Sequence, residues 1–141
     1  MTAKSLNEQL AVVYERAEPI VYTALRIIAG AMFMLHGVAK TFGVFGVDPS
    51  KLNAQLQVGG YIELVAGLLI ALGLGTRVAA FLASGQMAVA YLQFHWKFAF
   101  DSKFFPIVNG GDDTVLYCFV FLLIVVRGPG RASLDHVIFG R

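Results

Sequence analysis

The chain has 141 residues, of which 57 % are hydrophobic and only 14 % are charged, and its formal net charge is +2. Soluble domains carry about 25 % charged residues, so this composition disfavours an ordinary soluble protein, and the high hydrophobicity excludes a disordered chain. The basic residues form no stripe, which argues against nucleic acid as a partner. The single cysteine, Cys118, leaves no internal disulfide and no cysteine pair for redox chemistry or zinc binding.

Residues 1–18 are expected to form a short interfacial segment that precedes the main domain. They carry three glutamates, which does not fit a cleavable leader with a basic start and an apolar centre. Ser5 to Glu8 matches a capping box, and apolar residues follow at helical spacing. This pattern predicts an amphipathic helix on the membrane surface, with a frayed terminus as the alternative. Pro19 suits the first turn of the helix that follows.

Residues 19–141 contain four apolar runs, at positions 20–38, 58–74, 78–94 and 115–126. A helix needs about 17 to 20 apolar residues to cross a bilayer, and the first three runs are that long. The fourth covers roughly 18 Å as a helix and must borrow Asp113 and Thr114. The runs predict an all-α integral membrane protein, a four-helix transmembrane bundle. The alternative is a soluble bundle of buried helices, which would need polar faces that the last two runs lack.

The connections and the basic residues predict how the bundle is oriented. A tight turn at 73–76 joins the second and third runs, so both termini share a side with that turn. The terminal side carries six Lys and Arg residues and the loop side four, which favours termini in the cytoplasm. The predicted setting is therefore a membrane, with lipid as the surrounding partner and both termini on the cytoplasmic side.

Three local signals mark the ends of the predicted helices. Asn109, Gly110, Gly111 and Asp112 form a turn signal, with Asp112 or Asp113 as the expected N-cap. The Gly-Pro-Gly sequence at 128–130 should stop the fourth span, and Ser133 should cap a short terminal helix.

Two charges lie inside the apolar runs, where an unpaired charge is costly. Glu63 and Arg26 are both flanked by small residues at helical spacing, which lets helices approach closely. Both side chains are therefore expected to point into the bundle. For Arg26 the expected partners are Gln86 or Asp135, the latter by snorkelling.

Glu63, His36, Lys40 and His95 all fall near the loop-side end of their helices and could converge there. Trp96 and the neighbouring phenylalanines could add aromatic walls. One interpretation is structural, with Glu63 paired to Lys40 or His36. A second is a pocket in which histidine and carboxylate exchange protons with a quinone head group. A metal site from His36, His95 and Glu63 lacks supporting spacing, so no metal is expected.

The ordered motifs of the chain resemble the DoxX family of small four-helix membrane proteins over about residues 20–136. The similarity is carried by Leu25-Arg26 with Gly30 and Phe33, the segment His36–Lys40, Glu63 with Gly67 and Leu68, the segment Gly73–Ala80, Met87 and His95, the segment Asn109–Asp112 with Tyr117, and the segment Gly128–Arg131 with Ser133–Asp135. Where the family carries an NGGE-like segment, this chain has Asp112 in the acidic place.

The resemblance implies an integral protein of the bacterial inner membrane that is linked to oxidoreductase systems, some of which use quinone. The resulting hypothesis is a redox-associated membrane subunit that binds a quinone or a similar amphiphile, and quinone is the cofactor that this hypothesis implies. The alternative is a non-catalytic accessory or scaffold subunit whose partners are other subunits of a membrane complex. A carrier would need a continuous polar path, which the last two runs do not offer.

Overall fold

The computed structural model describes residues 3–140, and all regular structure in that range is helical. The helices are α1 (Ala3–Phe42), α2 (Ala54–Leu72), α3 (Thr76–Ala90), α4 (Pro106–Asn109), α5 (Asp112–Arg127) and α6 (Leu134–Phe139). A π-helical segment, Tyr91–Trp96, continues α3, and single 3-10 turns lie at Pro49–Lys51 and Ser102–Phe104. The all-helical prediction is confirmed for the described residues.

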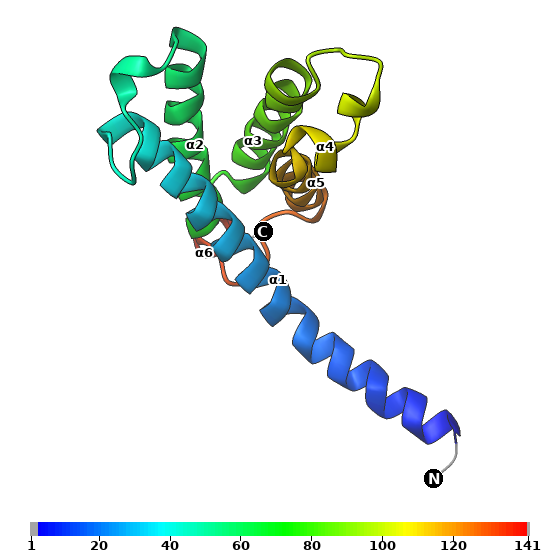
Figure 1. Cartoon of the computed structure of the whole chain (residues 1–141). Coiled ribbons are helices and arrows are strands. Elements are labelled where there is room, and N and C mark those ends of the chain that lie inside the picture. The colour runs from blue at the N-terminus through cyan, green and yellow to red at the C-terminus, as the bar shows by residue number, and fades with distance from the viewer. Residues whose placement is uncertain (1–2, 141) are drawn as a thin grey trace.

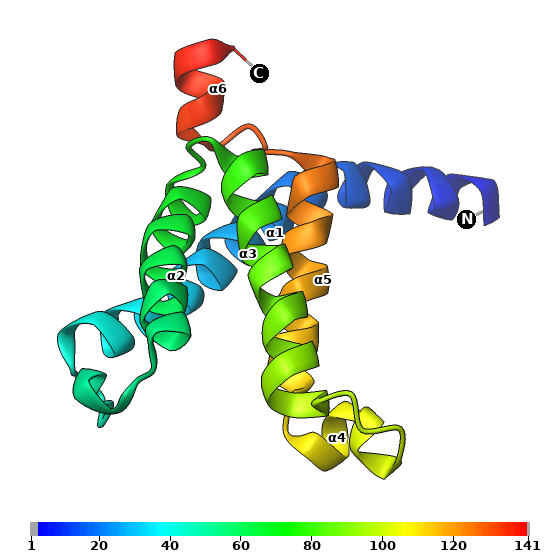
Figure 2. The same cartoon turned by 90° about the horizontal axis from the view of Figure 1, so that it is seen from above.

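The long helices form two pairs that open from a common turn. α1 packs mainly on α2, and α3 packs mainly on α5. Figure 1 shows the pairs diverging, while Figure 2 shows the α2–α3 turn and α6 at one end and the two longer loops at the other. This arrangement confirms that the short turn and the chain's C-terminal helix share an end.

Glycines form the contact between α1 and α2. A Cβ placed on Gly37 would lie 2.2 Å from the Leu64 amide nitrogen, and one on Gly67 would lie 2.5 Å from the amide nitrogen of Met34. Gly30 is similarly close to the Ala71 backbone at 2.6 Å, and a Cβ on Gly60 would lie 2.8 Å from the Lys40 Cβ. The predicted role of small residues in close helix approach is confirmed for this pair.

Alanines line the contact between α3 and α5, where Ala80 and Ala83 are fully buried against a core that includes Phe121 and Ile124. The polar side chain in this apolar contact is satisfied, since Ser84 Oγ donates a 2.8 Å hydrogen bond to the Cys118 carbonyl. A buried hydroxyl paired in this way costs little to hold among apolar groups.

Arg26 and Asp135 bind the two helix ends that meet at the α2–α3 turn. Arg26 is 1 % exposed and donates to the carbonyls of Ile70 (2.7 Å), Ala71 (3.2 Å) and Ala132 (2.6 Å). The Asp135 carboxylate accepts hydrogen bonds from the amides of Gly75 and Thr76 at 2.8 and 3.0 Å. A cation thus lies at the carboxyl end of α2 and an anion at the amino end of α3, as helix dipoles favour.

This arrangement corrects the expected partners of Arg26. Gln86 lies at the other end of the bundle, bonded to Glu63, and Asp135 acts on Arg26 through its charge without forming a direct ion pair. The physical reason is that the end of a helix presents unpaired carbonyl groups, and a buried guanidinium satisfies several of them at once. The expectation that Arg26 points inward is confirmed.

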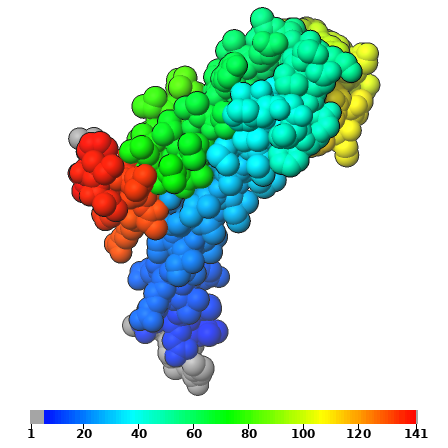
Figure 3. All heavy atoms as spheres, turned by 90° about the vertical axis from the view of Figure 1, so that its left-hand side faces the viewer, coloured from blue at the N-terminus to red at the C-terminus, as the bar shows by residue number. Residues whose placement is uncertain are grey.

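α1 corrects the expected break near Pro19. The helix runs without interruption from Ala3 to Phe42 and contains both Ser5 and Pro19, so Ser5 is not its N-cap. Proline frees only the carbonyl of Glu15, which lies on an exposed turn where water can bind it. Residues 6–18 project beyond the bundle (Figure 3), and their placement on a membrane surface stays a prediction.

α1 and α2 are long and apolar enough to cross a membrane. α5 has 16 residues, corresponding to about 24 Å, and includes Asp113 and Thr114 as the sequence predicted. Large apolar side chains cover the outward faces of the helices, among them Ile20, Val65, Phe81 and Leu116, each more than half exposed. An apolar exterior of this extent is typical of a surface in contact with lipid.

Candidate functional site

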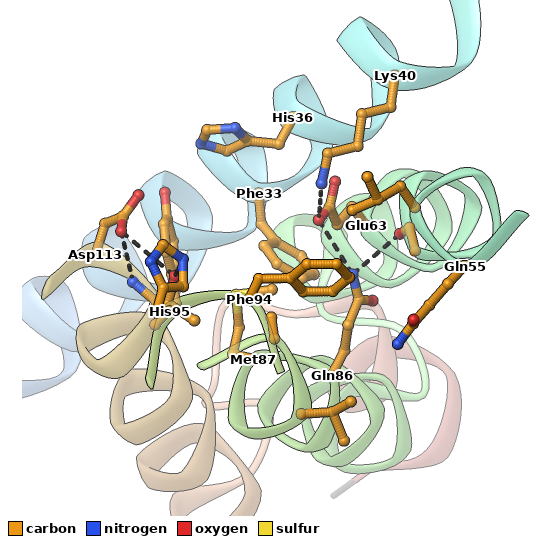
Figure 4. A pocket seen from close by; sticks show the side chains of 16 residues that line it. Phe33, His36, Lys40, Gln55, Glu63, Gln86, Met87, Phe94, His95 and Asp113 are labelled. Carbon is orange, nitrogen blue, oxygen red and sulfur yellow. Dashed lines mark hydrogen bonds and ion pairs between the residues drawn. The ribbon is translucent and has the colours of Figure 1, made fainter. Parts of the chain in front are cut away.

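A cavity of about 220 Å³ lies between the two helix pairs, toward the end that carries the long loops. Residues from α1, α2, α3, the π-helical segment and α5 line it (Figure 4). His36, Lys40, Glu63 and His95 are all among them. The structure therefore brings these four side chains to one region, as the sequence predicted.

Glu63 is the centre of one wall and joins three helices. The side chain is 3 % exposed on α2, and its Oε1 lies 2.6 Å from Lys40 Nζ of α1. Gln86 Nε2 of α3 donates to the same oxygen at 3.1 Å and to the Gly59 carbonyl, also at 3.1 Å. Of the two partners expected for Glu63, Lys40 is the one found. The sequence did not identify Gln86 as a partner of Glu63, because Gln86 follows the same helical spacing as the core alanines Ala79, Ala83 and Ala90.

Three buried polar atoms of the cavity residues have no hydrogen-bond partner within the described part of the chain. They are Glu63 Oε2, Gln86 Oε1 and the Tyr117 hydroxyl. The Gln86 amide is assigned with its nitrogen toward the Gly59 carbonyl and Glu63 Oε1, because both of these oxygens accept hydrogen bonds, and this leaves the Gln86 oxygen unpaired. Most buried polar atoms in proteins are paired, so three unpaired ones around one cavity indicate a polar ligand or water.

His95 lies on the opposite wall, on the π-helical segment. Its Nδ1 is 3.3 Å from the Asn109 carbonyl and its Nε2 is 3.2 Å from Thr114 Oγ1. A carbonyl only accepts hydrogen bonds, so Nδ1 donates to Asn109, while the Thr114 hydroxyl lies between His95 Nε2 and Asp113 Oδ1, the latter at 3.4 Å. His95 therefore shares the cavity with Glu63 without bonding to it. π-helical turns are frequent at functional sites.

His36 lines the cavity from α1 but is largely exposed and makes no contact with Glu63. Its ring meets the Tyr117 ring edge-on, with centroids 6.4 Å apart. The side chain is positioned beside the Tyr117 ring rather than beside the carboxylate. Among residues 3–140, no three His, Cys, Asp or Glu side chains come close enough together to hold a metal ion.

Trp96 is not part of the cavity wall, which corrects the expected aromatic lining. Its indole nitrogen donates to the Ala99 carbonyl at 2.6 Å, and its ring packs against Phe98, Phe100 and Phe104 in the loop. Trp96 ends the π-helical segment, after which Lys97 turns the chain with a φ of 55°. The cavity's aromatic residues are instead Phe33, Phe94 and Tyr117. Phe33, His36 and Lys40 follow one helical face, a signal that could have identified the first of them.

The segment Asn109–Asp112 begins α5, but neither aspartate is its N-cap. Gly111 occupies that position, and Asp112 and Asp113 lie in the first turn, where the helix dipole favours acidic side chains. The Asn109 amide accepts from the Gly111 nitrogen at 2.8 Å and donates to the Lys103 carbonyl at 2.7 Å. Asn109 thus holds the loop, the start of α5 and His95 together. The predicted stop after α5 and the Ser133 cap of α6 are confirmed.

Comparisons with known proteins agree with this architecture. The family model described as DoxX matches residues 21–96. An "uncharacterized protein" of Haemophilus influenzae is 40 % identical over 129 residues, which cover 89 % of this chain and 96 % of that protein. A second protein of that organism, with the same description, is 28 % identical over 94 residues, 67 % of this chain and 58 % of its own length. No solved structure matches. The chain is a member of the membrane-associated DoxX family.

Proposed function

We propose that this protein is a four-helix bundle of the bacterial inner membrane that binds a quinone-type amphiphile in the cavity beside Glu63, as part of an oxidoreductase system. The observation that carries the proposal is the set of unpaired polar atoms on Glu63, Gln86 and Tyr117 around one cavity. Aromatic rings of Phe33, Phe94 and Tyr117 in the same wall suit a flat ring.

The chemistry of the unpaired atoms favours the reduced form of such a ligand. Glu63 Oε2 and Gln86 Oε1 can only accept hydrogen bonds when the carboxylate is ionised. A quinol offers two hydroxyl donors, whereas a quinone offers two carbonyl acceptors. The Tyr117 hydroxyl can donate or accept and therefore serves either form. The Glu63 carboxylate could also receive a proton from a bound hydroxyl.

The position of the cavity suits a ligand with an apolar tail. Val89 lines the cavity and is 44 % exposed, so the cavity wall is not closed at this side chain. An isoprenoid-like tail could therefore leave between the helix pairs toward lipid while the polar ring stays beside Glu63. A cavity of about 220 Å³ holds the ring and leaves the tail outside.

The rival function is that of a non-catalytic scaffold subunit, and the ion pair between Lys40 and Glu63 favours it. This pair joins α1 to α2, with Gln86 adding α3, so it also stabilises the bundle. The two functions make different predictions for the polar atoms that have no partner within the chain. Quinol binding should depend on these atoms, whereas a scaffold should not.

Tyr117→Phe is the variant that separates them. It removes a hydroxyl that bonds to nothing in the described chain, so the thermal midpoint should not fall. Quinol binding to purified protein in nanodiscs, measured under anaerobic conditions, should weaken by about two- to tenfold, the value of one hydrogen bond. Glu63→Gln should weaken it as well.

Tyr22→Phe is the matched control, because the Tyr22 hydroxyl donates to the Gly128 carbonyl at the other end of the bundle. It should lower stability and leave quinol binding unchanged. Unaltered quinol affinity in Tyr117→Phe and Glu63→Gln, or no saturable binding by the unmodified protein, would leave the scaffold function as the conclusion.

A further inference from the structure

A second hollow, of about 670 Å³, lies at the opposite end of the bundle, where α3 begins and α5 ends. We call it the arginine groove, and it is lined by Arg77 of α3, Arg127 at the end of α5 and Arg131 of the segment before α6. Figure 2 shows α6 standing beside these two helix ends. The groove shares no lining residue with the cavity beside Glu63.

Two of the three guanidinium groups are held in place by the fold. Arg77 Nη1 donates to the Val126 carbonyl at 2.8 Å, at the carboxyl end of α5. Arg127 pairs with Glu18 and lies 4.2 Å from the centroid of the Tyr22 ring. Each group spends only part of its five N–H donors on these contacts. Arg131 is exposed and, within residues 3–140, forms no hydrogen bond or ion pair.

The carboxylate in the groove offsets this charge only in part. Both oxygens of Asp135 are already occupied by the Gly75 and Thr76 amides and by the Thr76 hydroxyl, at 2.8 to 3.0 Å. Three guanidinium groups therefore meet two carboxylates, Asp135 in the hollow and Glu18 on Arg127, which leaves an excess of one positive charge. Guanidinium groups are suited to phosphate, because their paired N–H donors match two phosphate oxygens.

Apolar side chains stand in the same hollow. Val78 is 68 % exposed and Phe139 is 62 % exposed, and both line it. The outer face of α3 continues from Val78 to Phe81, which is 64 % exposed. A ligand that fits the groove therefore has an anionic head and apolar chains that run along α3.

We propose that the arginine groove binds the phosphate of an anionic phospholipid, with the acyl chains lying against Val78 and the outer face of α3. The inference uses only the membrane setting of the chain, and it holds whether or not the cavity beside Glu63 binds quinol. Basic pockets between membrane helices are recognised sites for anionic head groups.

The test is the amount of phosphatidylglycerol and phosphatidylcholine that the full-length protein retains in detergent, measured by native mass spectrometry. Wild-type protein should retain phosphatidylglycerol in preference to phosphatidylcholine. Arg131→Gln should reduce the retained phosphatidylglycerol by about fivefold, the effect of one arginine near an anionic surface. Because Arg131 has no internal partner, the thermal midpoint of this variant should stay unchanged.

Lys103→Gln is the matched control, since it removes one exposed positive charge at the loop end, and it should retain phosphatidylglycerol like the wild type. Inorganic phosphate serves as the soluble competitor and should not displace the lipid at millimolar concentration. Displacement by phosphate would identify a free-phosphate site instead of a lipid site. Equal retention by Arg131→Gln and wild type would overturn the proposal.

Discussion

At the scale of single residues, helix ends and one ion pair satisfy the buried charges of Arg26 and Glu63 and the half-buried charge of Asp135. Arg26 binds the carboxyl end of α2, Asp135 binds the amino end of α3, and Glu63 binds Lys40. Each of these contacts joins segments that are distant in the sequence. The charges therefore determine how the helices are connected, while the apolar residues determine that they are helices.

Asp135 provides a prediction about pH. Burial by itself raises the pKa of this carboxyl group, but the hydrogen bonds from the Thr76 and Gly75 amides and the Thr76 hydroxyl, with the charge of Arg26, outweigh it and lower the pKa below the ordinary value of 3.8. A carboxyl group whose pKa is lower in the folded state stabilises the fold above its ordinary pKa. That contribution is lost as the pH falls through the lowered value.

We therefore expect Asp135→Asn to lower stability by about 1 kcal/mol at neutral pH, in the range of a lost helix cap. The difference in thermal midpoint between variant and wild type should be constant from pH 7 to about pH 4 and shrink below pH 3.8. Circular dichroism in detergent across this range measures it. A difference that grows with acidity would contradict the assigned hydrogen bonds.

At the scale of helices, close backbone contact holds α1 to α2. Gly37 and Gly67 lie where a Cβ would meet backbone atoms of the facing helix at 2.2 and 2.5 Å. In lipid the hydrophobic effect does not drive helices together, so this close packing is a main source of their association.

Gly37→Ala should therefore force α1 and α2 apart and destabilise the protein by about 1–3 kcal/mol or more. Gly85→Ala is the matched control, because Gly85 lies within α3 with open space around it. This control should be neutral or gain up to about 1 kcal/mol from helix propensity. Unfolding in mixed micelles, followed by circular dichroism, compares the two. Equal stabilities would show that α1 and α2 do not meet through these glycines.

At the scale of the whole molecule, two helix pairs joined by a clamped turn leave a polar cavity at one end and an arginine groove at the other. The proposed orientation places the groove at the cytoplasmic surface and the cavity near the opposite one. The terminal side carries more basic residues than the loop side, which is the basis for that orientation.

Cysteine labelling in intact cells tests this orientation. Glu8→Cys and Ser102→Cys, each combined with Cys118→Ser, place a single thiol at an exposed position on the terminal and the loop side. A membrane-impermeant maleimide should label the cysteine at position 102 directly and that at position 8 only after permeabilisation. The reverse pattern would invert the orientation, and labelling of both before permeabilisation would exclude the four-span topology.

The sequence by itself determined the helical character, the positions of the apolar runs, the inward direction of Glu63 and Arg26 and the end of the bundle where Glu63, Lys40, His36 and His95 meet. These properties follow from composition and from spacing along a single helix, which are local. Only the tertiary structure decided that Gln86 belongs to Glu63, that Arg26 binds carbonyl groups, that Trp96 turns away from the cavity and that α1 continues through Pro19. The physical reason is that a partner on another helix depends on rotation, crossing and depth between helices, and helical spacing within one segment does not contain that information.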